Sequence, residues 1–207
     1  SRRNYTIYFK DLNTGKILED KIENTTGRIV WANDNKTIFY TKKDDITLRS
    51  NKIFRHTLGT KSSEDILVYE EIDETFGCYI YKTKSKKYLM IGSYQTLSSE
   101  HRFLDADDPA GSWKIIHPRE KDLRYSVSHF EDEFYITTNW NAKNFRLMKT
   151  SISATSKNNW KEVIPHRDDV LLRSIDIFKN YLVVNERSEG LKKARVINWK
   201  NNSEYYI

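Results

Sequence analysis

The side chains best suited to metal binding or nucleophilic catalysis are few and scattered along the chain. There are five histidines and one cysteine. No two histidines have the H-x-x-x-H spacing of a helical metal site, and Cys78 is far in sequence from most of them. The sequence therefore predicts structural or surface histidines, with no metal site and no cofactor. The histidines are His56, His101, His117, His129 and His166.

Acidic pairs are a second source of possible chemistry, because two neighbouring carboxylates can act as acid and base or bind a cation. Each pair falls at an expected strand end or turn, and this position favours a structural role. The segment "DADDPAGSW" (105–113) lacks the terminal glutamate of a calcium loop and only half matches the Asp-box turn of sialidase propellers. The pairs are Asp44-Asp45, Glu70-Glu71, Asp107-Asp108 and Asp168-Asp169.

A hydrolase serine would need a particular local sequence, and the chain does not contain it. In α/β-hydrolases the nucleophile lies on a sharp turn, usually Gly-x-Ser-x-Gly. The nearest match is "IGSYQT" (91–96), which has no second glycine and lies in a strand-like run. Ser93 is therefore predicted to be a strand residue, and the chain by itself is predicted to have no peptidase activity.

The positive net charge does not by itself indicate a nucleic-acid partner. The chain has 207 residues, a net charge of +6 and a pI near 9.2, but its basic residues are dispersed. The densest cluster, "KTKSKK" (82–87), fits a solvated turn between two strands. We therefore expect no nucleic-acid partner. Short apolar runs predict no membrane span, and the single cysteine favours the cytoplasm while leaving the periplasm open.

The elements that position these residues are β-strands, because short alternating runs bounded by Asn, Asp, Ser and Gly extend from end to end. Three markers repeat in the same register. The first is a hydrophobic strand in "NKTIFYT", "SKKYLMI", "EDEFYIT" and "FKNYLVV". The second is an arginine at positions 55, 102, 146 and 195, and the third is the pair Trp113 and Trp160. The chain is predicted to be all-β.

A period in the high forties with about four strands per repeat is typical of β-propeller blades. The expected blades are 27–73, 76–122, 124–169 and 170–207, each running from inner to outer strand. Residues 4–26 are expected to form the outer half of a preceding blade, with a turn at 13–15. The prediction is an incomplete arc of about four and a half four-stranded antiparallel blades from a seven-bladed ring, with end blades that could self-associate.

Aromatic residues on the expected blade strands could stack against a ligand, but aromatics on blade strands usually pack between blades. We therefore assign them to the core. They are Trp31, Tyr40, Tyr81, Tyr135 and Trp140.

The order of several segments gives a more specific indication. "GRIVWANDNKTIFYT", "IFRHTLGT", "DILVYEEID", "KNFRLMKT", "WKEVIPHRD" and "YLVVNERSEGLKKARVIN" together resemble the propeller of the oligopeptidase B (protease II) group, in the prolyl oligopeptidase family of serine peptidases. The resemblance runs in family order over essentially the whole chain. It implies a propeller over an α/β-hydrolase domain that bears Ser, Asp and His. Neither that domain nor any catalytic residue can be assigned to this sequence.

The resemblance implies a function of gating: the propeller excludes folded proteins and admits short peptides, which the parent enzyme cleaves after Lys or Arg. Its expected partners are the hydrolase domain and basic peptides. Because the segment is basic, we expect acidic side chains, with Asp34 and Glu131 as candidates, to face the ring axis. The alternative is a stand-alone propeller that acts as a protein-interaction scaffold. A glycan-binding propeller would need repeated Asp-box turns, which are not found.

Overall fold

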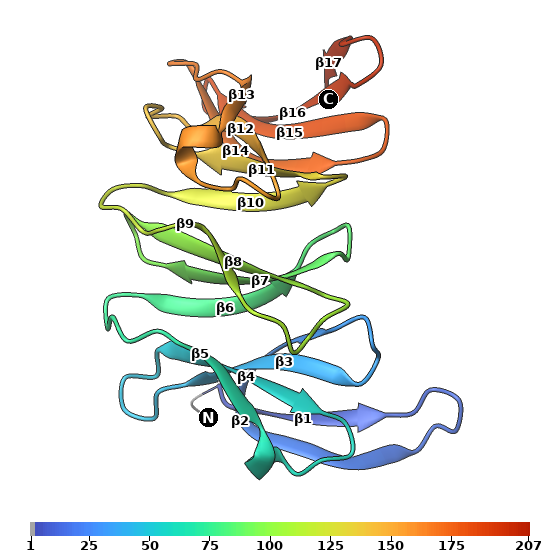
Figure 1. Cartoon of the computed structure of the whole chain (residues 1–207). Coiled ribbons are helices and arrows are strands. Elements are labelled where there is room, and N and C mark those ends of the chain that lie inside the picture. Colours follow the sequence, from blue (N-terminus) through green and yellow to red (C-terminus); the bar gives the residue numbers. More distant parts are fainter. Residues whose placement is uncertain (1–2) are drawn as a thin grey trace. The chain divides into compact units, whose positions relative to one another are not determined.

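The computed structural model describes residues 3–207 and contains seventeen strands and two short 3-10 helices (Figure 1). The first sheet contains β1 (Tyr5–Lys10), β2 (Ile17–Trp31), β3 (Thr37–Lys43), β4 (Ser50–Thr57) and β5 (Ile66–Glu70), and the second contains β6 (Gly77–Lys82), β7 (Tyr88–Tyr94), β8 (Ser99–Asp105) and β9 (Lys114–His117). The third contains β10 (Tyr125–Phe130), β11 (Glu133–Thr138), β12 (Arg146–Ser151) and β13 (Lys161–Ile164). The fourth contains β14 (Val170–Ile177), β15 (Tyr181–Ser188), β16 (Leu191–Asn198) and β17 (Glu204–Tyr206). The helices are η1 (Ser62–Glu64) and η2 (Lys157–Asn159).

Strand order within every sheet follows the sequence, and all pairings between strands for which a register is recorded are antiparallel. The repeat markers occupy equivalent places. The hydrophobic strand is the second of each four-stranded unit, and the repeated arginine is on the third, at β4, β8, β12 and β16. Trp113 and Trp160 each directly precede the fourth strand. The predicted all-β class and four-stranded antiparallel repeat are confirmed.

The hairpin at the start of the chain is joined to the first sheet more closely than expected. β2 is continuous across the expected boundary at residue 26 and pairs with both β1 and β3. Its register shifts between Thr25 and Ile29, where Gly27 has a φ of 77°. A side chain there would be strained by that φ, and its Cβ would lie 3.1 Å from the Tyr5 ring. The bulge therefore bends β2 without ending it.

Because β2 bends, the hairpin packs over one face of its own sheet. Ile7, Phe9 and Ile22 form a buried cluster with Ile38 and Tyr40 of β3. These are alternate residues of β3, as the two-residue period of a strand requires. The first sheet is therefore covered on this face by β1 and the first half of β2.

The opposite face of the first sheet packs against the second sheet. Phe39 and Ile53 share a fully buried cluster with Cys78, Ile80 and Leu89 of β6 and β7. Burial raises the pKa of the Cys78 thiol to about 12, with Glu71 adding to this effect, so the thiol is unreactive at neutral pH.

The chain divides into two compact units, which we describe separately. One comprises residues up to Thr96 with His101–Ile115, and the other comprises Leu97–Glu100 with Ile116–Ile207. In the second unit, Tyr135 and Leu147 of the third sheet cluster with Leu172, Leu182 and Val184 of the fourth. Each unit thus has its own hydrophobic core.

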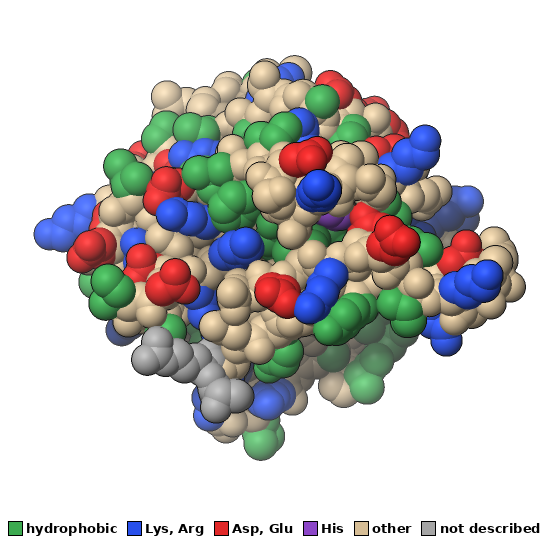
Figure 2. All heavy atoms as spheres, turned by 90° about the horizontal axis from the view of Figure 1, so that it is seen from below, with side chains coloured by type: hydrophobic (Ala, Val, Ile, Leu, Met, Phe, Trp, Pro, Cys, Tyr) green, Lys and Arg blue, Asp and Glu red, His purple; other side chains and the backbone are tan. Residues whose placement is uncertain are grey.

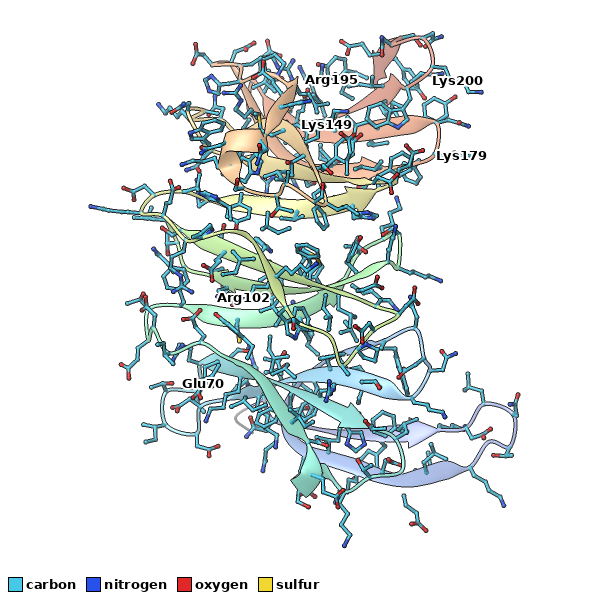
Figure 3. All side chains as sticks on the ribbon, in the orientation of Figure 1. Glu70, Arg102, Lys149, Lys179, Arg195 and Lys200 are labelled. Carbon is cyan, nitrogen blue, oxygen red and sulfur yellow. The ribbon has the colours of Figure 1, made fainter. Side chains whose placement is uncertain are left out.

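The repeated arginine, labelled at Arg102 and Arg195 in Figure 3, has a different partner in each sheet. Arg55 donates to the Pro109 carbonyl at 2.9 Å, and Arg102 lies 4.6 Å from the centre of the Tyr69 ring. Arg146 instead pairs with Glu162 on the adjacent strand of its own sheet. The repeat therefore specifies the position of the arginine but not its contact.

Candidate functional site

Asp34 lies in the turn between β2 and β3 and is exposed. Its carboxylate accepts hydrogen bonds from the amides of Lys36 (2.9 Å) and Thr37 (2.8 Å) and from the Thr37 hydroxyl (2.6 Å). Burial acts to raise the pKa of Asp34, but these hydrogen bonds outweigh it, so the pKa lies below its usual value. Asp34 is thus a charged residue that closes its own turn.

Glu131 lies in the equivalent turn of the third sheet, between β10 and β11. It is exposed and has a φ of 54°, a left-handed conformation that the tight turn requires. Asp34 and Glu131 belong to different compact units. The structure therefore places both at inner-hairpin turns, and their orientation toward a ring axis stays a prediction.

A cavity of about 600 Å³ lies beside the Asp34 turn, within the first unit. Its walls come from the end of β2, the turn after it, and the corresponding end and turn of β6. Among the described residues its lining includes two lysines and no carboxylate. The lining residues are Val30, Trp31, Ala32, Asn33, Asn35, Lys82 and Lys86.

The Lys82 ammonium is fixed at this cavity by two acceptors. It donates to the Trp31 carbonyl at 2.9 Å and to Asn33 Oδ1 at 2.5 Å. The pKa of Lys82 is lowered, first by burial and then by the nearby charge of Lys86. An ammonium has three donors, so these two bonds leave one for a further acceptor.

Asn33 links the two hairpins and orients the Lys82 contact. Its amide nitrogen donates to the Lys86 carbonyl at 3.2 Å and to Asp107 Oδ1 at 2.7 Å. Its backbone N–H donates to the Ala106 carbonyl at 2.8 Å. Because the amide nitrogen is committed to these acceptors, the amide oxygen points to Lys82.

Sequence reasoning missed this cavity. The sequence predicts a solvated turn at "KTKSKK", but the first residue of this segment, Lys82, is half-buried and anchored. The sequence also predicts a core position for Trp31, whereas this side chain is 36% exposed and lines the cavity. The available signal was the repeat itself, because Trp31 and Lys82 are the last residues of equivalent strands in successive repeats.

The other expected aromatic core residues divide by burial. Tyr40 is fully buried and Tyr135 is 7% exposed. Tyr81 and Trp140 are half-buried. The core assignment is thus confirmed for the first two.

One buried histidine lies between two carboxylates and so partly resembles the histidine of a catalytic triad. We call this group the His56 cluster (Asp20, Tyr40, His56 and Asp65). His56 Nδ1 is 2.6 Å from Asp65 Oδ1, and its Nε2 is 3.3 Å from Asp20 Oδ1. The Tyr40 hydroxyl donates to Asp65 Oδ2 at 2.7 Å. Both ring nitrogens thus contact carboxylates and neither contacts a serine or cysteine, so the cluster lacks the nucleophile–base pair of a triad.

A second buried charged network, the Glu186 cluster, contains Arg167, Glu186, Arg195, Glu204 and Tyr206. Glu186 is 2% exposed and pairs with Arg167 and with Arg195, whose Nη2 is 2.9 Å away. The Tyr206 hydroxyl donates to the same carboxylate at 3.2 Å. The carboxylate thus accepts hydrogen bonds from Arg167 and Tyr206 and lies beside a second guanidinium, which indicates a structural role.

The remaining chemical candidates have structural surroundings. Ser93 is fully buried on β7 and hydrogen-bonds the Tyr69 hydroxyl at 2.7 Å, as the strand interpretation predicts. Within residues 3–207, no three His, Cys, Asp or Glu side chains are grouped to hold a metal ion. The same part of the chain has no helix long and apolar enough to cross a membrane.

On the face shown in Figure 2, positive and negative side chains are mixed. Figure 2 shows lysine and arginine side chains interspersed with aspartate and glutamate on the visible face, with hydrophobic side chains between them. Paired examples are Lys21–Glu23 at 2.5 Å and Lys52–Glu70 at 3.4 Å.

Comparison with known proteins gives a match over the whole chain. The family model for "Prolyl oligopeptidase, N-terminal beta-propeller domain" matches residues 1–207. Dipeptidyl aminopeptidase BI of Pseudoxanthomonas mexicana is 40% identical over 99% of this chain and 28% of the relative. Protease 2 of Moraxella lacunata is 34% identical over 93% of this chain and 28% of the relative.

A solved structure agrees with these sequence matches. The structure of oligopeptidase B from Leishmania major superposes with a TM-score of 0.91 at 32% identity and covers 99% of this chain and 30% of its own. The chain thus spans less than a third of the length of these relatives. The four antiparallel sheets are propeller blades, and the chain belongs to the prolyl oligopeptidase family, as part of its N-terminal β-propeller domain.

Proposed function

We propose that the chain is the non-catalytic, substrate-gating propeller segment of a serine oligopeptidase that hydrolyses short peptides after Lys or Arg. The observation that carries this proposal is the match to an oligopeptidase B over 99% of the chain with a TM-score of 0.91. The chain contains no Gly-x-Ser-x-Gly sequence. Gating therefore acts by excluding folded substrates sterically, and the chemistry belongs to the hydrolase domain of the same protein.

The relative that is 40% identical is named a dipeptidyl aminopeptidase, and this favours a second candidate specificity. An enzyme that removes dipeptides needs a free substrate N-terminus, whereas an endopeptidase does not. The protein expressed from its complete reading frame should cleave N-acetylated peptides after Arg or Lys and leave matched peptides with Ala or Glu there intact. Cleavage of free but not acetylated peptides, with dipeptide products in mass spectrometry, would identify the aminopeptidase instead.

The blade boundaries belong to this proposal. The proposed blades are 27–73, 76–122, 124–169 and 170–207, and residues 4–26 form the outer half of a preceding blade. Packing of Ile22 over Ile38 and Tyr40 supports this, because the hairpin covers a sheet face as an adjacent blade would.

Asp34 and Glu131 are proposed to face the axis and to attract cationic peptides. Support comes from their exposure and from the lowered pKa of Asp34, which keeps it charged. The double variant Asp34→Asn with Glu131→Gln in the complete protein should lower kcat/KM for an Arg peptide at low salt but not at high salt. An unchanged kcat/KM at low salt would contradict this role.

The remaining partner proposals concern the ends of the chain. β17 has an entirely exposed burial pattern, with Tyr205 57% exposed and Tyr206 50% exposed. Such a strand recruits other strands, so the 207-residue chain should self-associate. Sedimentation over a concentration series tests this, and a monomer at all concentrations would contradict it.

The unpaired thiol of Cys78 supports a cytoplasmic location.

A further inference from the structure

The charged side chains that line the cavity beside the Asp34 turn are both lysines. The ammonium of Lys82 is fixed at its wall with one donor to spare, and Lys86 adds a second positive charge. Two carboxylates nearby add negative charge: Asp34, held by the amides of its turn, and Asp107, held by the Asn33 amide. Neither of them lines the cavity.

The rest of the wall is apolar and amide-bearing. Val30, Trp31 and Ala32 supply the apolar part, and the Trp31 ring is supported edge-on by Phe9 with 5.9 Å between centroids. Asn35 supplies an amide that can pair with a peptide bond. The ligand must therefore carry its negative charge close to an apolar group.

The volume sets the scale of the ligand. A cavity of about 600 Å³ falls within the range of ~300–1,000 Å³ typical of small-ligand sites. A bare inorganic anion would leave the indole and Val30 without contacts. A short peptide whose last residue is apolar matches the charge, the apolar wall and the amide together.

We propose that this cavity binds the C-terminal carboxylate of short peptides, with the apolar side chain of the last residue against Trp31. Lys82 and Lys86 hold the carboxylate, and Asn35 contacts the preceding peptide bond. The binding chemistry stands apart from the proposed peptidase activity, which matters only as the source or fate of the peptides. The site would retain peptides by their C-termini at one end of the first two blades.

The test uses the protein expressed from its complete reading frame and treated with a serine-directed covalent inhibitor, so that turnover cannot obscure binding. Calorimetric titration with N-acetyl-Ala-Ala-Phe as the free acid should give about tenfold or tighter binding than the matching C-terminal amide, because a charge-assisted contact is lost in the amide. If the inhibitor fails to label the protein, the peptidase proposal fails while the binding result remains informative.

Variants assign the preference to the cavity. Lys86→Gln changes an exposed side chain and should reduce the preference for the acid, and Lys82→Gln with Lys86→Gln should abolish it. Lys84→Gln is the matched control, since it is an exposed lysine of the same turn that does not line the cavity. Unchanged melting temperatures show that the variants fold, and Lys86→Gln alone serves if the double variant does not.

Three results would overturn the proposal. The acid and the amide could bind equally, or the preference could survive in the Lys86 and double variants. Alternatively, 3-phenylpropionate could bind as tightly as the peptide acid, which would show a site for small carboxylic acids without peptide recognition.

Discussion

The first and last sheets each bury a network of ionisable side chains, with an imidazole at the centre of one and a carboxylate at the centre of the other. In the His56 cluster an imidazole lies between the carboxylates of Asp20 and Asp65, at 3.3 and 2.6 Å. In the Glu186 cluster a carboxylate lies between the guanidiniums of Arg167 and Arg195. The first joins β2 of the hairpin to β4, and the second joins β15, β16 and β17 within one sheet.

This difference shows where each sheet depends on a single side chain. Asp20 also accepts the Gly59 amide at 2.5 Å, and Asp65 also accepts the Tyr40 hydroxyl, so the outer groups of the His56 cluster keep a partner without His56. Arg167 has Glu186 as its only ion-pair partner among residues 3–207. Removing the central group should therefore cost more in the last sheet than in the first.

The largest effect is expected for Glu186→Ala. The change leaves two guanidiniums without their buried carboxylate and should lower the free energy of unfolding by about 3–5 kcal/mol. Urea denaturation measures it. Glu189→Ala is the control, because that side chain is 82% exposed and has an exposed ion pair with Lys193. A similar loss in both variants would show that burial of the cluster does not matter.

A smaller loss, about 2 kcal/mol, is expected for His56→Phe. The ring retains its stacking on Phe9, where the centroids are 6.0 Å apart, but the two carboxylates lose a buried partner. Relative to wild type, the variant should also show a larger increase in amide hydrogen exchange in β1 and β2 than in β7. Equal protection in wild type and variant would show that His56 does not hold the hairpin to β4.

Asp34 gives the pH-dependent prediction. Its folded pKa lies below the usual value of 3.8, so its contribution to stability is complete above 3.8 and is lost as the pH falls through the folded value. Asp34→Ala should therefore cost about 1 kcal/mol near pH 6, and the difference between wild type and variant should shrink as the pH falls from 3.8 through the lower folded pKa of Asp34. A constant difference across that range would show that the charge of Asp34 does not support the turn.

The smallest effect is expected for Arg102→Lys, about 0.5–1 kcal/mol. The guanidinium lies over the Tyr69 ring at 4.6 Å, and an ammonium cannot stack in the same planar way. Thermal unfolding of the variant and of Lys179→Arg, an exposed control, compares the two. A larger loss of stability in the control would show that stacking of Arg102 on Tyr69 does not stabilise the fold.

The strands and their order could be predicted because period-2 alternation and the recurring arginines are local features of the sequence. The contacts could not, since they depend on residues from other repeats. The acceptor that fixes Lys82 is the carbonyl of Trp31, 51 residues earlier, so no feature of "KTKSKK" distinguishes its anchored lysine from its exposed ones. The continuity of β2 was missed because a left-handed Gly27 predicts a break as readily as a bulge.

Gating is the central functional claim, and one rate comparison tests it most directly. The complete protein is given one Arg-containing segment in two forms, as a free flexible peptide and as an exposed loop of a small, stable folded domain. We predict cleavage of the peptide and none of the folded form until that domain is unfolded by a destabilising substitution. Equal rates on the two forms would contradict steric gating by the propeller.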